Sequence, residues 1–387
     1  MEERFQKKLC ACKGKMLSVG GRLVLINSIL SNLSMYMLSF FEVPREVLKK
    51  LDFYRSRFFW QCDEHKKKYR LTKWSILSSP KDQGGLGILN LEVQNKCLLI
   101  KWLFKLINED GVWQQILRRK YLRHKTITQV EYMPGDSHFW SGLMNIKPDF
   151  LSLGRFQLGN GAQVRFWEDT WLGNLPFKCQ YPGLYNIVRK KSASVSTMFR
   201  SNPLNEAFRR SLVDNNLRQW QQLVARVVDV QLHDRDDRFI WSLHQNGMFT
   251  VRSMYRALTT NEVPHHHVKW KLKIPLKIKV FMWYLLKGVT LTKDNLAMRR
   301  WKRSVRCCFC NLDETIQDLF FDCLNAKFIW RLVQVVFNLP MPLNINDIFT
   351  NWLNGVNKKL RYQAWVGACS TLWAIWLSRN DVVFNKA

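Results

Sequence analysis

Apolar residues recur at helical spacing over most of this chain. Gly20 and Gly21 break an early basic stretch, and from Arg22 onward apolar side chains return every three or four positions. The same period continues in the ranges 46–60, 93–108, 112–122, 205–228 and 365–384. A period of about 3.6 residues places these side chains on one face of a helix, where they can pack against a core. The pattern therefore predicts a mainly helical protein.

The middle of the chain shows a different pattern, in which turn residues separate short apolar runs. A Gly-Asn-Gly sequence at 159–161 interrupts the run 156–167, and an Asn-Gly pair at 246–247 interrupts 238–251. Such sequences adopt the positive-φ backbone that tight hairpin turns require. We therefore expect two short β-hairpins in the middle of the chain, and a loop over the turn-rich range 172–200. The predicted fold class is α+β and predominantly α-helical.

The composition excludes a disordered protein and points to a polyanionic partner. The chain has 387 residues and is 47% hydrophobic, with 17 Trp and 24 Phe, enough for sizeable cores. Its 60 Lys and Arg residues outnumber 30 Asp and Glu residues, so the net charge is +30. Such an excess attracts polyanions, foremost nucleic acid and then an anionic membrane surface. The alternative is a basic protein without a specific polyanionic ligand.

The N-terminal sequence and the cysteine usage indicate an intracellular protein. The chain begins Met-Glu-Glu-Arg, which is unlike a secretory signal peptide. We therefore expect that the protein is not secreted, that it lies in the nucleus or the cytoplasm, and that its ten cysteines stay reduced. The longest uncharged run, 23–41, contains six Asn and Ser residues. That is too many for a membrane span, so we expect a buried helix there and no membrane association.

A cluster of cysteines near the C-terminus is the candidate metal site. Cys307, Cys310, Asp318 and Cys323 follow the spacing C-x2-C-x7-D-x4-C. Two cysteines separated by two residues can reach one ion from a tight turn, and a second pair of ligands can complete a tetrahedron around zinc. Asp318 is unusual, because structural zinc sites are mostly built from Cys and His. The alternative is a degraded site whose cysteines are ordinary buried thiols.

Two groups of lysines are candidates for contacts with the phosphates of a nucleic acid. The first group is the charge run Lys66, Lys67 and Lys68, and the second alternates with apolar residues in the range 270–287. The members of the second group are Lys271, Lys273, Lys277 and Lys279. Basic residues interleaved with aromatic ones can contact phosphates and stack on bases. The alternative for the first group is a solvated loop. The alternative for the second group is an aromatic core surrounded by exposed lysines, and we favour this core position for the aromatic residues of the range.

Three further motifs predict no chemistry. The adjacent histidines at 265–267 point in different directions and indicate a polar linker. The glycine-rich range 80–88 lacks the spacing of a phosphate-binding loop, so we interpret it as a turn. Asp236 and Asp237 form an Asp-Asp pair, but arginines flank them and no hydrophobic hairpin surrounds them. We interpret this pair as a surface charge cluster.

Several motifs follow one another in order along nearly the whole chain. They are Gly-Gly-Arg-Leu at 20–23, Gly-Gly-Leu-Gly at 84–87, Phe-Trp-Glu-Asp-Thr-Trp at 166–171, the aromatic and basic range 270–299, the cysteine cluster with Leu-Phe-Phe-Asp-Cys at 319–323, and Trp-Ala-Ile-Trp at 373–376. This order resembles the region after the palm in reverse transcriptases of plant LINE-type (non-LTR) retrotransposons. The resemblance implies four parts. They are a helical thumb-like region following a palm (1–125), a linking region with the two hairpins (126–263), a small helical reverse-transcriptase zinc-binding domain (264–345) and a C-terminal helical segment (346–387).

The resemblance also implies a ligand set for zinc. In the family pattern, Cys307, Cys310, the residue at 318 and Cys323 bind the ion, and the family has His where this chain has Asp318. Glu314 matches a position that the family also fills with Glu, and we expect it to support the site from outside the ligand set.

The resemblance finally implies a nucleic-acid-binding reverse-transcriptase fragment without polymerase activity of its own. In-line phosphoryl transfer uses two metal ions that palm aspartates hold, and we identify neither such aspartates nor RNase H carboxylates in this sequence. The expected partner is RNA or an RNA–DNA hybrid, which the protein would hold by its phosphates without reading its sequence. The alternatives are a decayed, non-functional retroelement product and an accessory structural subunit of a polymerase encoded elsewhere.

Overall fold

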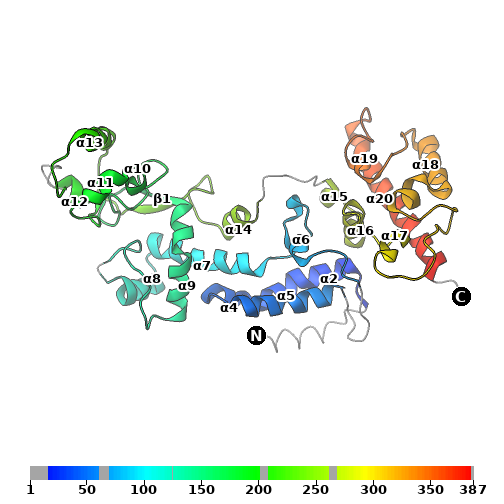
Figure 1. Ribbon diagram of the computed structural model, residues 1–387, viewed down its shortest axis with the longest axis horizontal. Coiled ribbons are helices and arrows are strands. Elements are labelled where there is room, and N and C mark those ends of the chain that lie inside the picture. Colours follow the sequence, from blue (N-terminus) through cyan, green and yellow to red (C-terminus); the bar gives the residue numbers. More distant parts are fainter. Residues whose placement is uncertain (1–15, 61–68, 124, 201–207, 261–267, 385–387) are drawn as a thin grey trace. The chain divides into compact units, whose positions relative to one another are not determined.

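The computed structural model describes residues 16–60, 69–123, 125–200, 208–260 and 268–384 (Figure 1). These residues form two compact units that interleave along the sequence, and each unit is described by itself. Unit 1 takes its described residues from Met1–Ser34, Arg45–Asn90 and Thr260–Ala387, and unit 2 takes them from Met35–Pro44 and Leu91–Thr259. The predicted four-part division of the chain stays a prediction.

Helices dominate both units, which confirms the predicted fold class. Elements labelled η are 3-10 or π-helical turns. Unit 1 contains α2 (Val19–Leu25), η2 (Ile26–Leu30), α3 (Ser31–Leu33), α5 (Arg45–Trp60), α6 (Trp74–Ser78), η3 (Lys81–Gln83), α15 (Val268–Lys271), α16 (Leu276–Leu286), α17 (Lys293–Ala297), η6 (Asp318–Asp322), α18 (Leu324–Phe337), α19 (Ile345–Phe349) and α20 (Lys358–Phe384).

Unit 2 contains the remaining helices and the two strands. They are α4 (Met35–Phe40), α7 (Leu91–Asn108), α8 (Val112–Leu117), η4 (Arg118–Leu122), α9 (His138–Ser152), β1 (Gly154–Gln157), α10 (Phe177–Gln180), α11 (Pro182–Ile187), α12 (Val195–Arg200), α13 (Asp214–Val227), β2 (Arg238–Trp241) and α14 (Val251–Thr259). None of the helices that the structure describes combines the length and the apolar character needed to cross a bilayer.

Glycines allow a close helix contact in unit 1. Helix α2 is capped by Ser18, whose Oγ accepts a hydrogen bond from the Gly21 N–H at 3.2 Å. Gly20 and Gly21 therefore lie inside the helix, whereas we expected them to precede it. A Cβ atom on Gly20 would lie 2.8 Å from the backbone nitrogen of Lys277. The missing side chain thus lets α2 pack directly on the first turn of α16.

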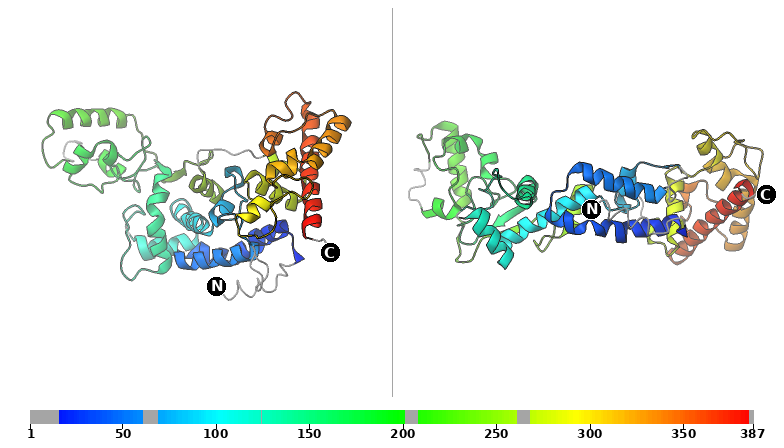
Figure 2. Two further views of the ribbon diagram at one scale, coloured as in Figure 1. Left: turned by 45° about the vertical axis from the view of Figure 1, so that its right-hand side comes forward. Right: turned by 90° about the horizontal axis from the view of Figure 1, so that it is seen from below.

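Helix α7 is the centre of unit 2, and α4, α9 and α14 pack against it (Figures 1 and 2). One buried side chain on α7, Asn95, fixes the end of α4. Its Nδ2 donates to the carbonyl oxygens of Leu38 and Phe41, both at 2.7 Å, and its Oδ1 accepts from the Val43 N–H at 2.9 Å. These bonds satisfy backbone groups that a helix end leaves without partners.

The two predicted β-hairpins do not form, and this prediction was wrong. The single sheet in the described part of the chain pairs β1 with β2 in antiparallel fashion, from Gly154 opposite Trp241 to Gln157 opposite Arg238. The strands that we expected to pair locally therefore pair with each other across more than 80 residues. The Asn-Gly pair at 246–247 does form a turn, because the Gly247 N–H donates to the His244 carbonyl at 3.0 Å, but no second strand follows it.

The loop after β1 folds around Asp237 instead of forming a hairpin turn. The Oδ1 atom of Asp237 accepts from the N–H groups of Gly159 and Gly161, at 2.7 and 3.0 Å, and its Oδ2 accepts from the Gln163 N–H at 3.0 Å. A Cβ on Gly159 would lie 2.1 Å from the Arg235 carbonyl oxygen, so only glycine fits this approach. Asp237 is buried, and its assignment to a surface charge cluster was wrong; its neighbour Asp236 is exposed.

Two other turn-rich ranges have different outcomes. The range 172–200 is not a loop, because it contains α10, α11 and α12 around the buried side chains of Phe177 and Leu184. The glycine-rich range 80–88 is a turn, as predicted. Gly84 has a φ of 77° there, and its carbonyl oxygen accepts a hydrogen bond from Trp283 Nε1 at 2.8 Å. The glycines of this turn thus serve packing within unit 1.

We predict that Asp237→Asn lowers the free energy of unfolding by about 1.5–3 kcal/mol, because the amide replaces an ionised acceptor of three backbone N–H groups and turns its own N–H₂ group toward them. The midpoint of urea unfolding measures this change. Asp236→Asn is the matched control, since the exposed neighbour should change stability by less than about 0.5 kcal/mol. Equal shifts for the two variants would contradict the assignment.

Candidate metal centre

Short elements of unit 1 bring the four candidate ligands together. Cys307 begins a tight loop that carries Cys310 and is closed by a backbone hydrogen bond from the Cys307 N–H. Asp318 is the first residue of η6, and its N–H donates to Thr315 Oγ1 at 3.0 Å. Cys323 lies between η6 and α18, and its N–H donates to the Asp318 carbonyl oxygen at 2.8 Å. The loop and the helical turn thereby direct all four side chains to one point.

The ligand atoms of Cys307, Cys310, Asp318 and Cys323 all lie within 4.8 Å of one another. The Sγ atoms of Cys307 and Cys323 are 3.9 Å apart, and Cys310 Sγ lies 3.5 and 3.7 Å from the two carboxylate oxygens of Asp318. Three of the four residues are buried, and Cys310 is half-buried. The predicted ligands are therefore neighbours in space, with three sulfur donors of the type that zinc prefers and one carboxylate that it can also bind.

Burial raises the pKa of the thiols of Cys307, Cys310 and Cys323, that of Cys307 to about 12. Backbone N–H groups act in the opposite direction, for example those of Phe309 and Cys310 on the Cys307 sulfur. Such N–H groups favour the thiolate form, but they do not outweigh burial. Without a nearby cation, the three thiols are therefore protonated at neutral pH.

A buried ion pair lies beside this cluster. Arg379 donates from Nε and from one terminal guanidinium nitrogen to Glu314 Oε1, at 3.0 and 2.5 Å, and both side chains are 0% exposed. The same carboxylate oxygen accepts the Lys293 N–H at 2.9 Å. The guanidinium also lies over the rings of Trp376 and Phe384, at 5.2 and 5.3 Å. Glu314 thus lies outside the ligand set, and it links the loop of the cluster to helix α20.

The sequence analysis did not identify Arg379 as a structural residue. A signal was present, because the buried positions of α20 continue as a helical stripe through Ala368, Leu372 and Ile375 to Arg379. A lone arginine on such a stripe indicates a buried charge that requires an acidic partner. The partner, Glu314, is 65 residues away in the sequence and could not be found by spacing.

The structure places the second group of candidate lysines around a buried aromatic core. Lys271, Lys273 and Lys277 are exposed. Lys279 is half-buried, its Nζ donates to the Trp270 carbonyl oxygen at 3.1 Å, and burial followed by repulsion from Lys81 lowers its pKa. The neighbouring aromatic side chains are indeed in the core, because Phe281 and Trp283 are buried.

Two motifs of the sequence analysis lie outside the described residues. They are the lysine run Lys66, Lys67 and Lys68 and the histidines at 265–267.

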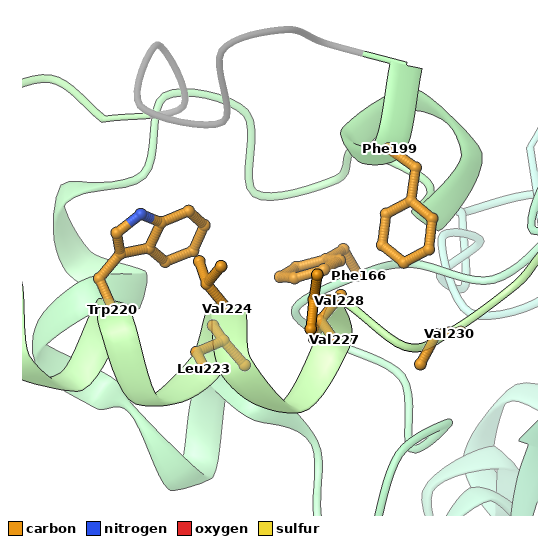
Figure 3. Close-up of a pocket in the computed structure, with 8 residues that line it drawn as sticks. All are labelled: Phe166, Phe199, Trp220, Leu223, Val224, Val227, Val228 and Val230. Carbon is orange, nitrogen blue, oxygen red and sulfur yellow. The ribbon is translucent and has the colours of Figure 1, made fainter.

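Unit 2 contains an apolar pocket of about 200 Å³ (Figure 3). Helix α13 provides one wall with Trp220, Leu223, Val224 and Val227, and Phe199 faces them from α12. Every lining residue is apolar, so the pocket offers no charged group to a phosphate or a metal ion. It therefore adds nothing to the candidate metal centre.

Residues 249–330 match a protein family described as zinc-binding in reverse transcriptase. This range contains all four candidate ligands. The chain therefore carries a reverse-transcriptase zinc-binding domain, and the resemblance that the motif order indicated is confirmed there.

Two curated plant proteins are also similar to the chain. A putative ribonuclease H protein of Arabidopsis thaliana is 29% identical over 339 residues, which cover 85% of this chain and 54% of that protein. An uncharacterized mitochondrial protein of Arabidopsis thaliana is 29% identical over 143 residues, which cover 36% of this chain and 92% of that protein. The chain thus spans about half the length of the first of these relatives.

We predict that Glu314→Gln or Arg379→Gln lowers the free energy of unfolding of unit 1 by about 3–5 kcal/mol, because each change leaves a buried charge without its partner. Thermal and urea unfolding followed by circular dichroism measure the loss. Lys359→Gln, on the exposed start of α20, is the control. The double variant Glu314→Gln/Arg379→Gln should lose much less than the sum of the single losses. Additive losses would show that the two side chains do not act as a pair.

Proposed function

We propose that Cys307, Cys310, Asp318 and Cys323 hold one structural zinc ion, and that the domain around it binds the phosphate backbone of RNA or an RNA–DNA hybrid. The spacing of the four ligand atoms in the folded chain carries this proposal. In this function the chain is a binding part of a reverse-transcriptase system and performs no polymerase chemistry itself.

Two of the distances between ligand atoms match the edges of a zinc tetrahedron. Zinc–sulfur bonds of about 2.3 Å and zinc–oxygen bonds of about 2.0–2.2 Å place two sulfurs about 3.8 Å apart, and a sulfur and an oxygen about 3.6 Å apart. The observed distances are 3.9 Å for Cys307 and Cys323, and 3.5 Å for Cys310 and the nearer oxygen of Asp318. The sulfur atoms are too far apart for a disulfide, which would require about 2.05 Å. These two distances support an ion-binding site, and all four ligand atoms lie within 4.8 Å of one another.

The chemistry of the donor set also supports a cation. Three thiols and a carboxylate, which are among the donor groups that bind zinc, converge in a mostly buried place. A zinc ion would supply the positive charge that converts these thiols to thiolates, with release of their protons. The backbone N–H groups that already face the sulfur of Cys307 would then stabilise the thiolate.

The charge of the chain supports a nucleic-acid partner. The net charge is +30, and exposed Lys271, Lys273 and Lys277 lie in the part of unit 1 that packs around the metal centre. Lysine contacts phosphates as a point charge and does not read bases. Lys66, Lys67 and Lys68 belong to the same proposal, and Lys279 can contribute once its bond to the Trp270 carbonyl is released.

The Asp-Asp pair of the sequence does not offer a catalytic metal site. Asp237 uses both carboxylate oxygens for three backbone N–H groups, and Asp236 is an exposed neighbour that accepts from Asn160. Two-metal phosphoryl transfer requires carboxylates that face an open site. This arrangement favours binding without catalysis as the function of the chain.

We predict about one zinc per chain in the purified full-length protein, measured by elemental mass spectrometry. Asp318→His should keep the zinc and hold it more tightly against a chelator, because imidazole is a better ligand than carboxylate in structural sites. Cys310→Ser and Cys323→Ser should lose it. Cys308→Ser is the matched control, since Cys308 does not belong to the group of four.

Two results would contradict the proposed zinc site. Zinc bound only by the Asp318→His variant would show that position 318 has lost its function, which favours a decayed retroelement product. Zinc retained at wild-type affinity after Cys310→Ser would show that the ligand set is different.

We predict that the triple variant Lys271→Gln/Lys273→Gln/Lys277→Gln binds single-stranded RNA more weakly and with a less steep salt dependence. Each lost phosphate contact should reduce the slope of log affinity against log salt by about 0.7, so three contacts reduce it by about 2. Fluorescence anisotropy over a salt series measures the slope. The control removes three exposed charges elsewhere in unit 1, Lys327→Gln/Arg331→Gln/Lys359→Gln. Equal slopes for both triple variants would show that binding has no preferred face.

A further inference from the structure

The helical segment formed by α8 and η4 in unit 2 has one face fixed to the core and one face exposed. The inner face contains Gln114, Leu117, Arg118 and Tyr121. Their spacing of three, one and three residues places them on the same side of a helix. Gln114 and Leu117 are buried, and Arg118 and Tyr121 are half-buried. Leu122, at the end of the segment, is also half-buried against the core, and the other positions are exposed. The chemistry of these exposed positions is different from that of an ordinary solvated face.

Polar and aromatic contacts hold the inner face rigidly. Arg118 donates to the carbonyl oxygens of Leu106 and Glu109, at 2.8 and 2.7 Å, and forms an ion pair with Asp110 at 2.8 Å. Tyr121 stacks on Trp140 with ring centres 4.3 Å apart and an angle of 5° between the rings. The segment is therefore a fixed platform, and binding to its outer face would not require it to become ordered first.

The outer face combines exposed apolar side chains with positive charge. Val112, Trp113 and Ile116 are 77%, 57% and 50% exposed. The exposed basic residues that follow them are Arg119, Lys120, Arg123 and Lys125. The range 112–125 contains no Asp or Glu. The preceding acids are directed elsewhere, because Asp110 pairs with Arg118, and Glu109 pairs with Lys105 at 3.2 Å.

We infer that this outer face binds single-stranded nucleic acid, with an unpaired base stacked on Trp113 and the adjoining phosphates held by Arg119 and Arg123. An exposed indole beside cations of one sign is the combination that single-strand binding uses, because stacking needs an accessible aromatic ring and the backbone needs positive charge. A duplex would offer its phosphates to the arginines but no free base to the indole. This inference rests on the proposed nucleic-acid function and assigns to it a second face, in the other unit.

The charge of this face and the small extent of its apolar part together favour a nucleic acid as the occupant. A protein partner or a second copy of the chain would use the apolar residues, but this chain is itself strongly basic, so two copies of the face would repel each other. The apolar residues occupy little more than one turn and continue directly into the basic residues. A strand of nucleic acid matches both parts, since Trp113 and Lys120 are about 10 Å apart along the helix axis.

The test uses the full-length chain and two fluorescent probes, a 20-nucleotide oligouridylate and an RNA duplex of the same length. Trp113→Ala should weaken binding of the single strand by about ten-fold, and Trp113→Phe by less than about three-fold, because phenylalanine keeps a stacking ring. Neither change should weaken binding of the duplex. Leu175→Ala is the matched control, since Leu175 is also 57% exposed in unit 2.

Variants of the two arginines test the phosphate contacts. Arg119→Gln/Arg123→Gln should reduce the salt slope for the single strand by about 1.4, which corresponds to two phosphate contacts. Arg209→Gln/Arg210→Gln removes an exposed basic pair elsewhere in unit 2 and should leave affinity and slope within about 20% of wild type.

Three results would overturn the inference. Trp113→Ala and Leu175→Ala could leave single-strand affinity equally unchanged while the triple variant at Lys271, Lys273 and Lys277 weakens it; the proposed function would then stand and this face would not. Trp113→Ala could change only the self-association measured by light scattering, which would identify a protein contact. Wild-type protein that binds neither probe would refute both this inference and the proposed nucleic-acid function.

Discussion

A single buried carboxylate organises the surroundings of the candidate metal centre. The Glu314 carboxylate accepts hydrogen bonds from the guanidinium of Arg379 and from the backbone N–H of Lys293. The backbone N–H of Glu314 donates to the Val305 carbonyl oxygen at 2.9 Å. Its carbonyl oxygen accepts the N–H of Asp294 at 3.2 Å. Helix α17, the loop that carries the cysteines, and helix α20 therefore meet at one residue. Because two buried charges lose their hydration together, neither can move away from the other without a large cost.

The candidate ligands could be predicted from the sequence because they are close along the chain. All four lie within the range 307–323, where one tight loop and one helical turn are sufficient to bring them together. The ion pair beside them could not be predicted in this way. The spacing of residues along the sequence predicts contacts only within one helix or one loop. Glu314 and Arg379 are 65 residues apart and meet only through the packing of α20 on the rest of unit 1.

The hairpin predictions failed because one sequence signal has two physical causes. Glycine is required wherever φ is positive, and also wherever another backbone approaches too closely for a Cβ atom. The glycine of the Asn-Gly pair at 246–247 belongs to the first case, with a φ of 70°. Gly159 belongs to the second case, because the approaching backbone is that of Arg235 and Asp236. A single sequence does not show which segment approaches, so the turn was predictable and the pairing of β1 with β2 was not.

The charge of the surroundings affects the electrostatic cost of having an aspartate at position 318. Zinc with three thiolates and a carboxylate carries two negative charges, one more than zinc with three thiolates and a neutral histidine. Nearby cations act on this region. The pKa of the Cys308 thiol, next to Cys307, is raised by burial and then by Glu314, and is lowered by Lys293 and Arg379. These two cations lessen the cost of the extra negative charge that an aspartate ligand would bring, and Glu314 acts in the opposite direction. Basic residues thus bear both on the proposed nucleic-acid partner and on the proposed oxygen ligand of the zinc site.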